Sequence, residues 1–389
     1  MSELKKNLSL FIPGLLSSII IFLAACQQTQ GTSPALNNPI TENSPTAAAT
    51  KTPILPTNTP SATTSPSESP APTSTQTATE IPRTTLLFTG VIVPARCVQA
   101  AIDEYQDSDY LYDEVREVIQ GADLAIGTLN ATISDYPPRT GCVPTYVLVG
   151  GSENADALQR AGFDLMSVAT NHIKNCGLNN CGDRAFQDTM ENLNRVGILP
   201  IGAGNNLQEA LQPVVVDING VRFGFVSLGQ LEPIAFASED TPGIAVLTEE
   251  NLRAAIQEAR KVSDVVIVMP HWGPEDVPMP NWSQLDLARV AVEAGADLVV
   301  GNHTHVIQAI EEVDGVPVFY GLGNFVFDQN WDLQHQQGVI LIASFEGSEL
   351  LDYQLIPTHV DFDGRVHIAD QQEAAQILDR IAEVSRSLP

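Results

Sequence analysis

Four of the seven histidines stand directly after short apolar runs, in segments rich in Asn, Gly and Thr. Neutral imidazole is a ligand for Zn, Mn and Fe, and a His-x-His pair in one loop can direct two rings toward one or two ions. Such a pair alone is also typical of surface histidines in a polar loop. The other two histidines favour a shared site, because they follow runs of the same kind. The four are His172, His271, His303 and His305.

The apolar runs alternate with amphipathic segments, which predicts an α/β fold with buried strands. A Gly-x-Asp pattern opens three of the runs, at Gly121, Gly162 and Gly295. In this pattern we expect Gly at a helix C-cap and Asp in the turn. Ligands bind at the carboxyl ends of strands in open α/β sheets, so the polar residues that follow the strands should converge there. These residues are Asn171, His172, His271, His303, His305 and Asn324.

The C-terminal part is expected to close the fold. Residues 338–345 and 351–356 are apolar runs of strand length and predict an antiparallel pair. Residues 370–388 have the amphipathic pattern of a surface helix.

The N-terminus has the pattern of an export signal. Lys5 and Lys6 precede an apolar stretch at 8–25, which ends in Leu23-Ala24-Ala25-Cys26. Small residues before a cysteine at this point resemble the bacterial lipobox, in which the signal peptide is removed and the cysteine carries a lipid. An uncleaved transmembrane anchor is the alternative, because the stretch is near the length of a span. Both predict an extracytoplasmic chain, and the lipobox predicts one that is lipid-anchored to the membrane at Cys26.

Three segments follow from composition. Residues 1–26 are the expected signal peptide, and residues 27–83 are dominated by Thr, Ser, Pro and Ala. The second segment has too little apolar surface to offset the entropy of ordering its backbone, so a disordered tether is expected. One folded domain is expected at 84–389, with its core at 84–345.

Four cysteines remain beyond Cys26, an even number that is consistent with two disulfides in an oxidising compartment. Cys176 and Cys181 are close enough to staple one loop, which leaves Cys97 with Cys142. Zinc ligation by the four is the alternative, although no Cys-x-x-Cys pair occurs.

The chain carries 47 acidic and 19 basic side chains, for a formal net charge of -28. Such a surface repels phosphates, so nucleic acid is excluded as a partner. An anionic polymer is repelled too, unless bound cations or a basic patch reverse the field locally. Arg96 and Arg139 flank the motif regions and are candidates for such a patch. Screening over about 8 Å at physiological salt means that the repulsion slows encounter more than it forbids binding.

The motifs at 169–172 (Ala-Thr-Asn-His), 271–275 (His-Trp-Gly-Pro-Glu), 301–308 (Gly-Asn-His-Thr-His-Val-Ile-Gln) and 320–327 (Tyr-Gly-Leu-Gly-Asn-Phe-Val-Phe) resemble the CapA family. The resemblance covers about residues 84–345. Members of that family take part in poly-γ-glutamate capsule synthesis. Their fold is similar to the calcineurin-like metallophosphatases, which implies an α/β layered sandwich with mixed β-sheets flanked by helices.

The resemblance also implies roles for individual residues. It makes His172 a general acid or an electrostatic stabiliser of a leaving oxygen, which its near-neutral pKa suits. Glu275 and Trp272 are placed at the pocket mouth, although plain packing is an alternative for Trp272. Asn324 supports the loop from below, and Asn302 belongs to the same site. The implied ligands of a divalent Mn, Zn or Fe ion are Asn171, His271, His303 and His305.

Three positions depart from the family pattern. The first strand of the family ends in Gly-Asp, where this chain has Gly90-Val91. The second ends in Asn-Leu-Glu, where this chain has Thr128-Leu129-Asn130, and Asn175 replaces an Asp after the Asn-His pair. Paired dications need anionic oxygen ligands, so one ion is favoured over two.

Several functions fit this pattern. The resemblance favours a cell-envelope lipoprotein of capsule or poly-γ-glutamate synthesis or export, with a partly degenerate metal-dependent hydrolase-type site. A non-catalytic lipoprotein that binds an anionic polymer, a cell-wall component or a partner protein is the alternative. A metal-scavenging lipoprotein is a third.

Overall fold

The computed structural model describes residues 82–176 and 181–389. The predicted signal peptide at 1–26, with Cys26, lies outside the described residues, as does the predicted tether up to residue 81. The first strand begins at Arg83, one residue before the predicted domain boundary. Among the helices of the described ranges, none is long and apolar enough to cross a bilayer.

The larger sheet is mixed, with the strand order β18-β17-β16-β1-β2-β5-β6 and with β15 paired to β1. β1, β2, β5 and β6 pair in parallel, and β16 pairs antiparallel with both β1 and β17. The strands are β1 (Arg83–Ile92), β2 (Leu124–Leu129), β5 (Leu165–Ser167), β6 (Leu199–Ile201), β15 (Asn324–Val326), β16 (Gln337–Glu346), β17 (Glu349–Val360) and β18 (Val366–Ile368).

The second sheet is also mixed and has the order β13-β14-β12-β11-β9-β8. Its central strands β9, β11, β12 and β14 are parallel, and β8 and β13 add antiparallel edges. The strands are β8 (Val214–Ile218), β9 (Val221–Gly229), β11 (Val265–His271), β12 (Leu298–Val300), β13 (Ile310–Val313) and β14 (Val316–Phe319). Two short ladders join β3 (Thr132–Ile133) to β4 (Val149–Gly150) and β7 (Ala203–Gly204) to β10 (Gly243–Ile244).

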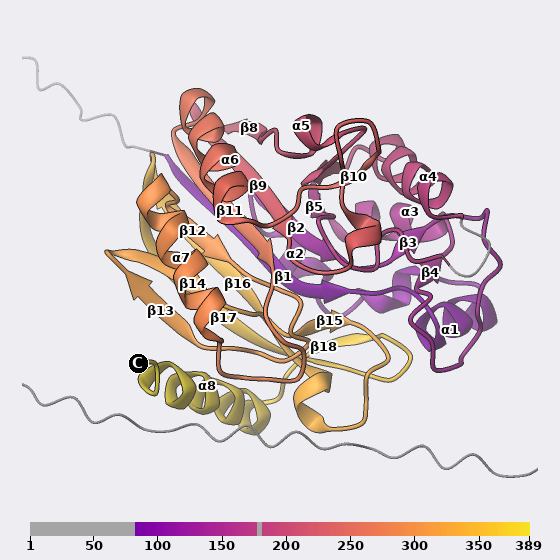
Figure 1. The fold of residues 1–389 in the computed structure, drawn as a ribbon. Helices are drawn as coiled ribbons and strands as arrows, with labels where there is room; N and C mark the ends of the chain where they lie inside the picture. The colour runs from indigo at the N-terminus through magenta and orange to yellow at the C-terminus, as the bar shows by residue number, and fades with distance from the viewer. Residues whose placement is uncertain (1–81, 177–180) are drawn as a thin grey trace, which may run out of the picture. The chain divides into compact units, whose positions relative to one another are not determined.

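Most of the helices cover the outer faces of the two sheets, and the C-terminal helix contributes to the core between them (Figure 1). The α-helices are α1 (Cys97–Tyr105), α2 (Arg116–Gln120), α3 (Glu153–Ala161), α4 (Gly182–Arg195), α5 (Leu207–Ala210), α6 (Glu249–Val262), α7 (Trp282–Ala294) and α8 (Gln371–Arg386). The short 3-10 turns are η1 (Asp109–Leu111), η2 (Pro233–Ala235) and η3 (Leu333–Gln336).

Alternating side chains on β1 show how the layers form, because successive residues of a strand point to opposite faces. Leu86 and Phe88 belong to the core that also contains Phe223 and Phe225 of the second sheet. Leu87 belongs to a separate core beneath the helices on the outer face of the first sheet. A third core lies between the second sheet and helices α6 and α7. Two mixed sheets packed face to face and flanked by helices are the layered α/β class that the sequence predicts.

The helix ends mostly follow the predicted glycine rule. Gly162 and Gly295 close α3 and α7 in the left-handed conformation, with φ of 109° and 111°. Gly121 also closes α2, as predicted, but in the right-handed conformation, with φ of -78°. Helix α2 ends there in a right-handed turn in which the Gly121 N–H donates to Val118 O. Gly121 therefore needs none of the backbone freedom that glycine supplies.

The C-terminal part follows the sequence expectation and extends it. β16 and β17 form the predicted antiparallel pair, and β17 continues to Val360. Helix α8 starts after Asp370, whose carboxylate accepts the N–H groups of Gln372 and Glu373. Its buried residues Ile377 and Ile381 join the core between the sheets.

Candidate functional site

Three side chains that follow different strands meet at the carboxyl ends of the two sheets. Asn171, His271 and His303 form what we call the inner cluster. The Nε2 atom of His271 lies 2.9 Å from Asn171 Oδ1 and 3.1 Å from His303 Nδ1. All three residues are buried. The predicted convergence of residues 100 and 32 positions apart in the chain is therefore present in the fold.

The loop after β12 aims two of the imidazoles. His303 and His305 have φ of 104° and 59°, in a region that side chains other than Gly rarely occupy. The loop is held by the backbone of Asn302, whose N–H donates to Pro270 O and whose C=O accepts from Trp272 N–H. Non-glycine residues in this conformation persist only where the surroundings fix them, and they are frequent at functional sites.

His305 lies apart from the inner cluster, and its ring centroid is 6.1 Å from that of His303. Its Nδ1 lies 2.8 Å from Asn324 Oδ1. The Asn324 amide nitrogen donates to Gln329 Oε1 and to His335 O, which fixes the amide with its oxygen toward His305. The Nδ1 atom of His305 must therefore carry the proton, and Nε2 presents a lone pair.

The imidazoles of the site are held neutral. Burial, together with His305 and His172, lowers the pKa of His303 to about 3. Burial also lowers the pKa of His305 to about 4, although the hydrogen bond to Asn324 opposes this shift. Burial likewise lowers the pKa of His271 well below its ordinary value, followed by the effects of His303 and His305. Neutral imidazole is the form that ligates metals and accepts protons.

His172 occupies the edge of the site. Its ring stacks against Tyr146 at a centroid distance of 6.3 Å, and its backbone N–H donates to Asn130 Oδ1. Burial lowers its pKa to about 4, which a hydrogen bond to the Tyr146 backbone opposes in part. Its Nδ1 lies 3.5 Å from the Asn175 amide nitrogen. A neutral His172 suits a proton acceptor better than the predicted general acid.

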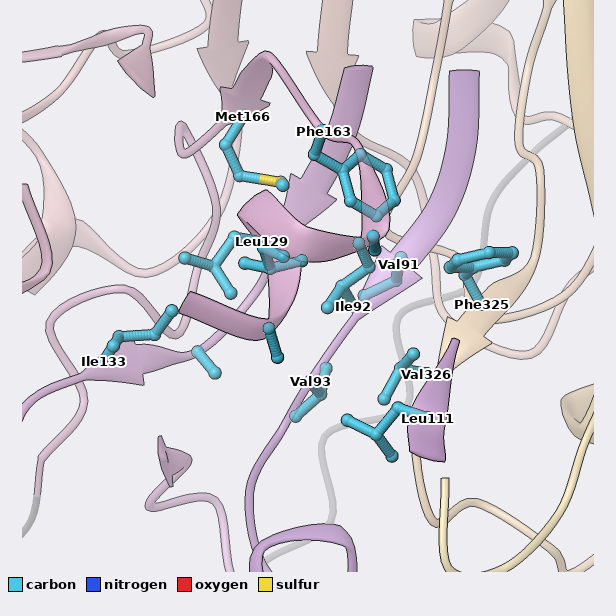
Figure 2. Packing of buried hydrophobic residues seen from close by; sticks show 14 of the residues in the cluster. Val91, Ile92, Val93, Leu111, Leu129, Ile133, Phe163, Met166, Phe325 and Val326 are labelled. Carbon is cyan, nitrogen blue, oxygen red and sulfur yellow. The ribbon is translucent and has the colours of Figure 1, made fainter. Parts of the chain in front are cut away.

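The side chains at the positions that depart from the family pattern pack in the core or form hydrogen bonds within the fold. Val91 is fully buried in the core on the helix side, among Ile92, Leu129 and Phe325 (Figure 2). The Thr128 hydroxyl accepts a hydrogen bond from the Asn302 amide. Asn130 fixes the backbone of His172. Each neutral side chain therefore packs or bonds locally.

The donor set of the inner cluster fits one divalent ion. The separations at His271 Nε2 are close to the roughly 3 Å between neighbouring ligands around an ion with bonds of about 2.1 Å. Three buried polar atoms nearby have no hydrogen-bond partner, which leaves capacity for a bound group. These are His271 Nδ1, Asn130 Nδ2 and Asn302 Oδ1.

The inner cluster contains no carboxylate ligand for a second ion. Within residues 82–176 and 181–389, no group of three or more His, Cys, Asp and Glu side chains forms a metal-ligand set. The nearest carboxylate contact of the inner cluster is Glu275 Oε1, 3.9 Å from His303 Nε2. Two dications held close together need bridging or flanking anionic oxygens, and this site lacks them.

A cavity of about 580 Å³ opens beside the inner cluster. It is walled by the loop between β3 and β4, the loop after β11 and the segment after β15. Glu275 lies in this wall, as the family resemblance implies. The lining residues used below are Arg96, Tyr146, His172, Glu275, His305 and Trp331.

The structure corrects the prediction that Arg96 and Arg139 offset the negative charge. The Arg96 guanidinium bonds to the Asp328 carboxylate and donates to Thr145 O at 3.2 Å. Arg139 is paired with Asp103 and Glu153. Both arginines are neutralised by carboxylates, so neither forms a basic patch.

The prediction that Trp272 shapes the pocket mouth was also wrong. Its ring is fully buried in the core beneath α6 and α7, and its Nε1–H donates to Tyr320 O at 2.9 Å. It follows His271 directly, and alternation along the extended chain turns it to the opposite face. The packing alternative is the one that the structure supports.

His335 is a residue that the sequence reasoning missed. It is buried, and its two ring nitrogens lie 2.7 Å from Asp276 Oδ1 and 2.9 Å from Asp332 Oδ1. It thereby joins the loop after β11 to the segment after β15. Its partner Asp276 is 59 residues away, so no local pattern could have identified it.

Two disulfides are present, with the pairing that the sequence predicts. Cys97–Cys142 ties the start of α1 to the loop that carries Tyr146, and Cys176–Cys181 brackets residues 177–180. The first disulfide therefore fixes one wall of the cavity.

A layered α/β fold with imidazoles and an amide at the strand ends defines a protein with a potential metal-binding crevice. The chain belongs to the bacterial capsule synthesis protein PGA_cap family, whose model matches residues 85–329. This range includes both disulfides, the inner cluster and most of the cavity wall.

Two curated relatives carry related descriptions. The PGA biosynthesis protein CapA of Bacillus subtilis is 31% identical over 246 residues, which cover 63% of this chain and 63% of that protein. The capsule biosynthesis protein CapA of Bacillus anthracis is 29% identical over 256 residues, which cover 64% of this chain and 60% of that protein. The matched region thus spans less than two thirds of either relative.

Solved structures of similar fold include a phosphatase of Mycoplasma pneumoniae, with a TM-score of 0.45 at 10% identity, covering 71% of this chain and 94% of that one. A 5'-nucleotidase precursor of Thermus thermophilus has a TM-score of 0.40 at 16% identity, covering 77% and 58%. Both TM-scores are low, so the fold class stated above rests on the strand order and the helix layers.

Proposed function

We propose that the chain is an extracytoplasmic accessory protein in the synthesis or export of a capsular polymer of the poly-γ-glutamate type. Family membership and the descriptions of the two Bacillus relatives support the polymer. The lipobox at Cys26 and the Thr/Ser/Pro-rich segment after it support a domain tethered to the membrane by a lipid.

The site is proposed to bind the polymer and to hold one divalent ion of Mn, Zn or Fe, through Asn171, His271 and His303. The observation that carries this proposal is the carboxylate-free inner cluster. A bound ion would supply Lewis-acid polarisation and a contact for an anionic group. The inner cluster would orient that contact, and the cavity would receive the adjoining part of the ligand.

The test of this function is a pair of assays on the purified chain. Activated phosphoesters with added Mn, Zn or Fe should show no turnover above the buffer rate. Immobilised poly-γ-glutamate should retain the wild type in the presence of the ion, and a His303→Gln variant should be retained less. Robust phosphoester turnover that His172→Ala abolishes would refute the binding role.

The anchor is tested separately. Wild-type chain expressed in a bacterial host should fractionate with membranes and incorporate labelled lipid. Cys26→Ser should lose the label, and it should be released or remain as an uncleaved precursor. A Cys26→Ser variant that still carries the lipid would contradict the anchor.

A second function, a single-ion hydrolase or transferase acting on γ-glutamyl bonds, is favoured by one observation. The His305 Nε2 lone pair belongs to a neutral imidazole in the cavity wall, where it can accept a proton from an attacking nucleophile. Shortening of a defined γ-glutamyl oligomer by wild type, but not by His305→Gln, would establish this activity. An unchanged oligomer length would exclude it.

A further inference from the structure

The cavity wall carries exposed aromatic rings. Tyr146 and Trp331 are 78% and 59% exposed, although both line the cavity. The third ring, Phe327, already has the Arg96 guanidinium over its face at 4.6 Å. Exposed aromatic faces attract cations, because the ring quadrupole is negative above the plane. Tyr146 and Trp331 are therefore the rings available to a ligand.

The charged side chain Glu275 in the cavity wall also favours a positively charged ligand. Glu275 is partly exposed, and within the described residues its contact of ion-pair length is to His303 Nε2, 3.9 Å away. Asp276 has His335 as its partner, and Arg96 has Asp328. Among the described residues, no lysine or arginine is paired with the Glu275 carboxylate.

A buried acceptor completes the arrangement. His305 is 3% exposed and lines the cavity, with Nδ1–H committed to Asn324. Its Nε2 has no hydrogen-bond partner among the described residues, so its lone pair is available to a ligand. A carboxylate, an imidazole lone pair and aromatic faces together favour a ligand that donates several hydrogen bonds and carries positive charge.

We infer that the cavity recognises a primary ammonium group. An alkylammonium supplies three N–H donors and one positive charge, which match Glu275, His305 Nε2 and the faces of Tyr146 and Trp331. A carboxylate in the same place would meet Glu275 and the His305 lone pair and would be repelled. The inference about the ammonium stands on the cavity alone. That the ammonium is the amino terminus of a γ-glutamyl chain rests on the proposed function.

The first experiment measures the binding of n-butylammonium to the intact chain at pH 7, by calorimetry or by Trp fluorescence. It should bind at least tenfold more tightly than n-butanol or butyrate, which match its shape without its charge. Glu275→Gln should weaken binding about tenfold, and Trp331→Leu about threefold. The control Glu312→Gln, on the distant strand β13, should leave binding unchanged. Equal binding of the neutral or anionic probe, or no effect of Glu275→Gln, would overturn the inference.

The second experiment identifies the source of the amine. A γ-glutamyl oligomer with a free amino terminus should bind about tenfold more tightly than the same oligomer after N-acetylation, and 1,4-diaminobutane should bind no better than n-butylammonium. Failure of both oligomers while n-butylammonium binds would overturn the polymer as the occupant and leave the ammonium site standing. Failure of n-butylammonium would overturn the ammonium site itself, whatever the oligomers do.

Discussion

His303 in the inner cluster and His367 on the β17–β18 hairpin have pKa values shifted in opposite directions. Burial lowers that of His303 to about 3. Burial also acts to lower that of His367, but hydrogen bonds to Glu114 and Asp361 outweigh it and raise the pKa. The His367 ring nitrogens lie 2.9 Å from Glu114 Oε2 and 2.6 Å from Asp361 Oδ2. His303 Nδ1 instead lies 3.1 Å from His271 Nε2, and its carboxylate contact, Glu275, is 3.9 Å away.

The difference lies in the carboxylates and not in the histidines. On the hairpin, His359 and His367 are opposite each other across the ladder, and Asp361 lies close to both. His359 Nδ1 lies 3.0 Å from Glu373 Oε1 of α8, and His367 Nδ1 lies 2.9 Å from Glu114 Oε2, so both rings join the hairpin to neighbouring elements. At the strand ends, burial and the neighbouring imidazoles keep the rings neutral, and their lone pairs can bind a ligand. The same residue type therefore supplies a structural ion pair in one region and a binding site in the other.

The largest test of this contrast is the effect of pH on stability. The four site histidines are His172, His271, His303 and His305, and all have lowered pKa values in the fold. Below about pH 6.5 the unfolded chain gains protons that the folded chain does not, so stability falls as pH falls. From pH 7 to pH 5 the free energy of unfolding should drop by up to about 2 kcal/mol for each histidine.

Urea unfolding of chelator-treated protein at both pH values measures this drop. A His303→Gln variant should show a smaller drop than the wild type, because one titrating ring is removed. Equal stability at pH 7 and pH 5 would show that the rings are not held neutral.

Substitutions of Asn324 test whether an added carboxylate gives a site histidine the raised pKa of His367. Asn324→Leu should cost about 2–3 kcal/mol, because His305 Nδ1, Gln329 Oε1 and the His335 carbonyl lose their partner in a buried place. Asn324→Asp keeps an acceptor for His305 and adds a negative charge, so it should raise the His305 pKa toward hairpin-like behaviour. Histidine NMR titration measures the shift, and an unchanged His305 pKa would contradict the role given to carboxylates.

His335 tests the link between the two cavity walls. His335→Gln can keep only one of the two hydrogen bonds, so the free energy of unfolding should fall by about 1–2 kcal/mol. The loops around Asp276 and Asp332 should then exchange their amide hydrogens faster. Hydrogen exchange with mass spectrometry measures this, and Glu312→Gln serves as the matched surface control. Unchanged exchange in both loops would show that His335 does not hold them.

The smallest effect is expected on the hairpin. Because the His367 pKa is raised in the fold, its contribution to stability is full below about pH 6.5 and is lost as pH rises through the folded pKa. His367→Gln should therefore cost less than about 1 kcal/mol at pH 6 and close to nothing at pH 9. A larger cost at pH 9 than at pH 6 would reverse the sign and contradict the ion-pair interpretation.

Patterns of neighbouring residues correctly predicted the strands and the positions of the residues that follow them. Apolar runs of strand length located β11 and β16, and the residues that follow strands had to reach one edge of the sheets. Asn171 and His271 could be placed together on that ground, without knowing the separation between them.

Pairings between distant segments escaped prediction. Arg96 was expected to serve as free positive charge, but it finds Asp328, 232 residues away. His335 is matched to Asp276 by the packing of two loops, and Trp272 is turned into a core that only the folded sheets define. Such contacts depend on which long-range neighbours the fold supplies, and no spacing in the chain encodes them.

The most direct test of the central claim is the metal stoichiometry of the purified chain. After equilibration with Mn, Zn or Fe and removal of free ions, elemental analysis should find one divalent ion per chain in the wild type. Variants Asn171→Ala and His303→Gln should lose that ion, while His367→Gln should retain it. Two ions per wild-type chain, or one ion that survives both inner-cluster substitutions, would contradict a carboxylate-free single-ion site.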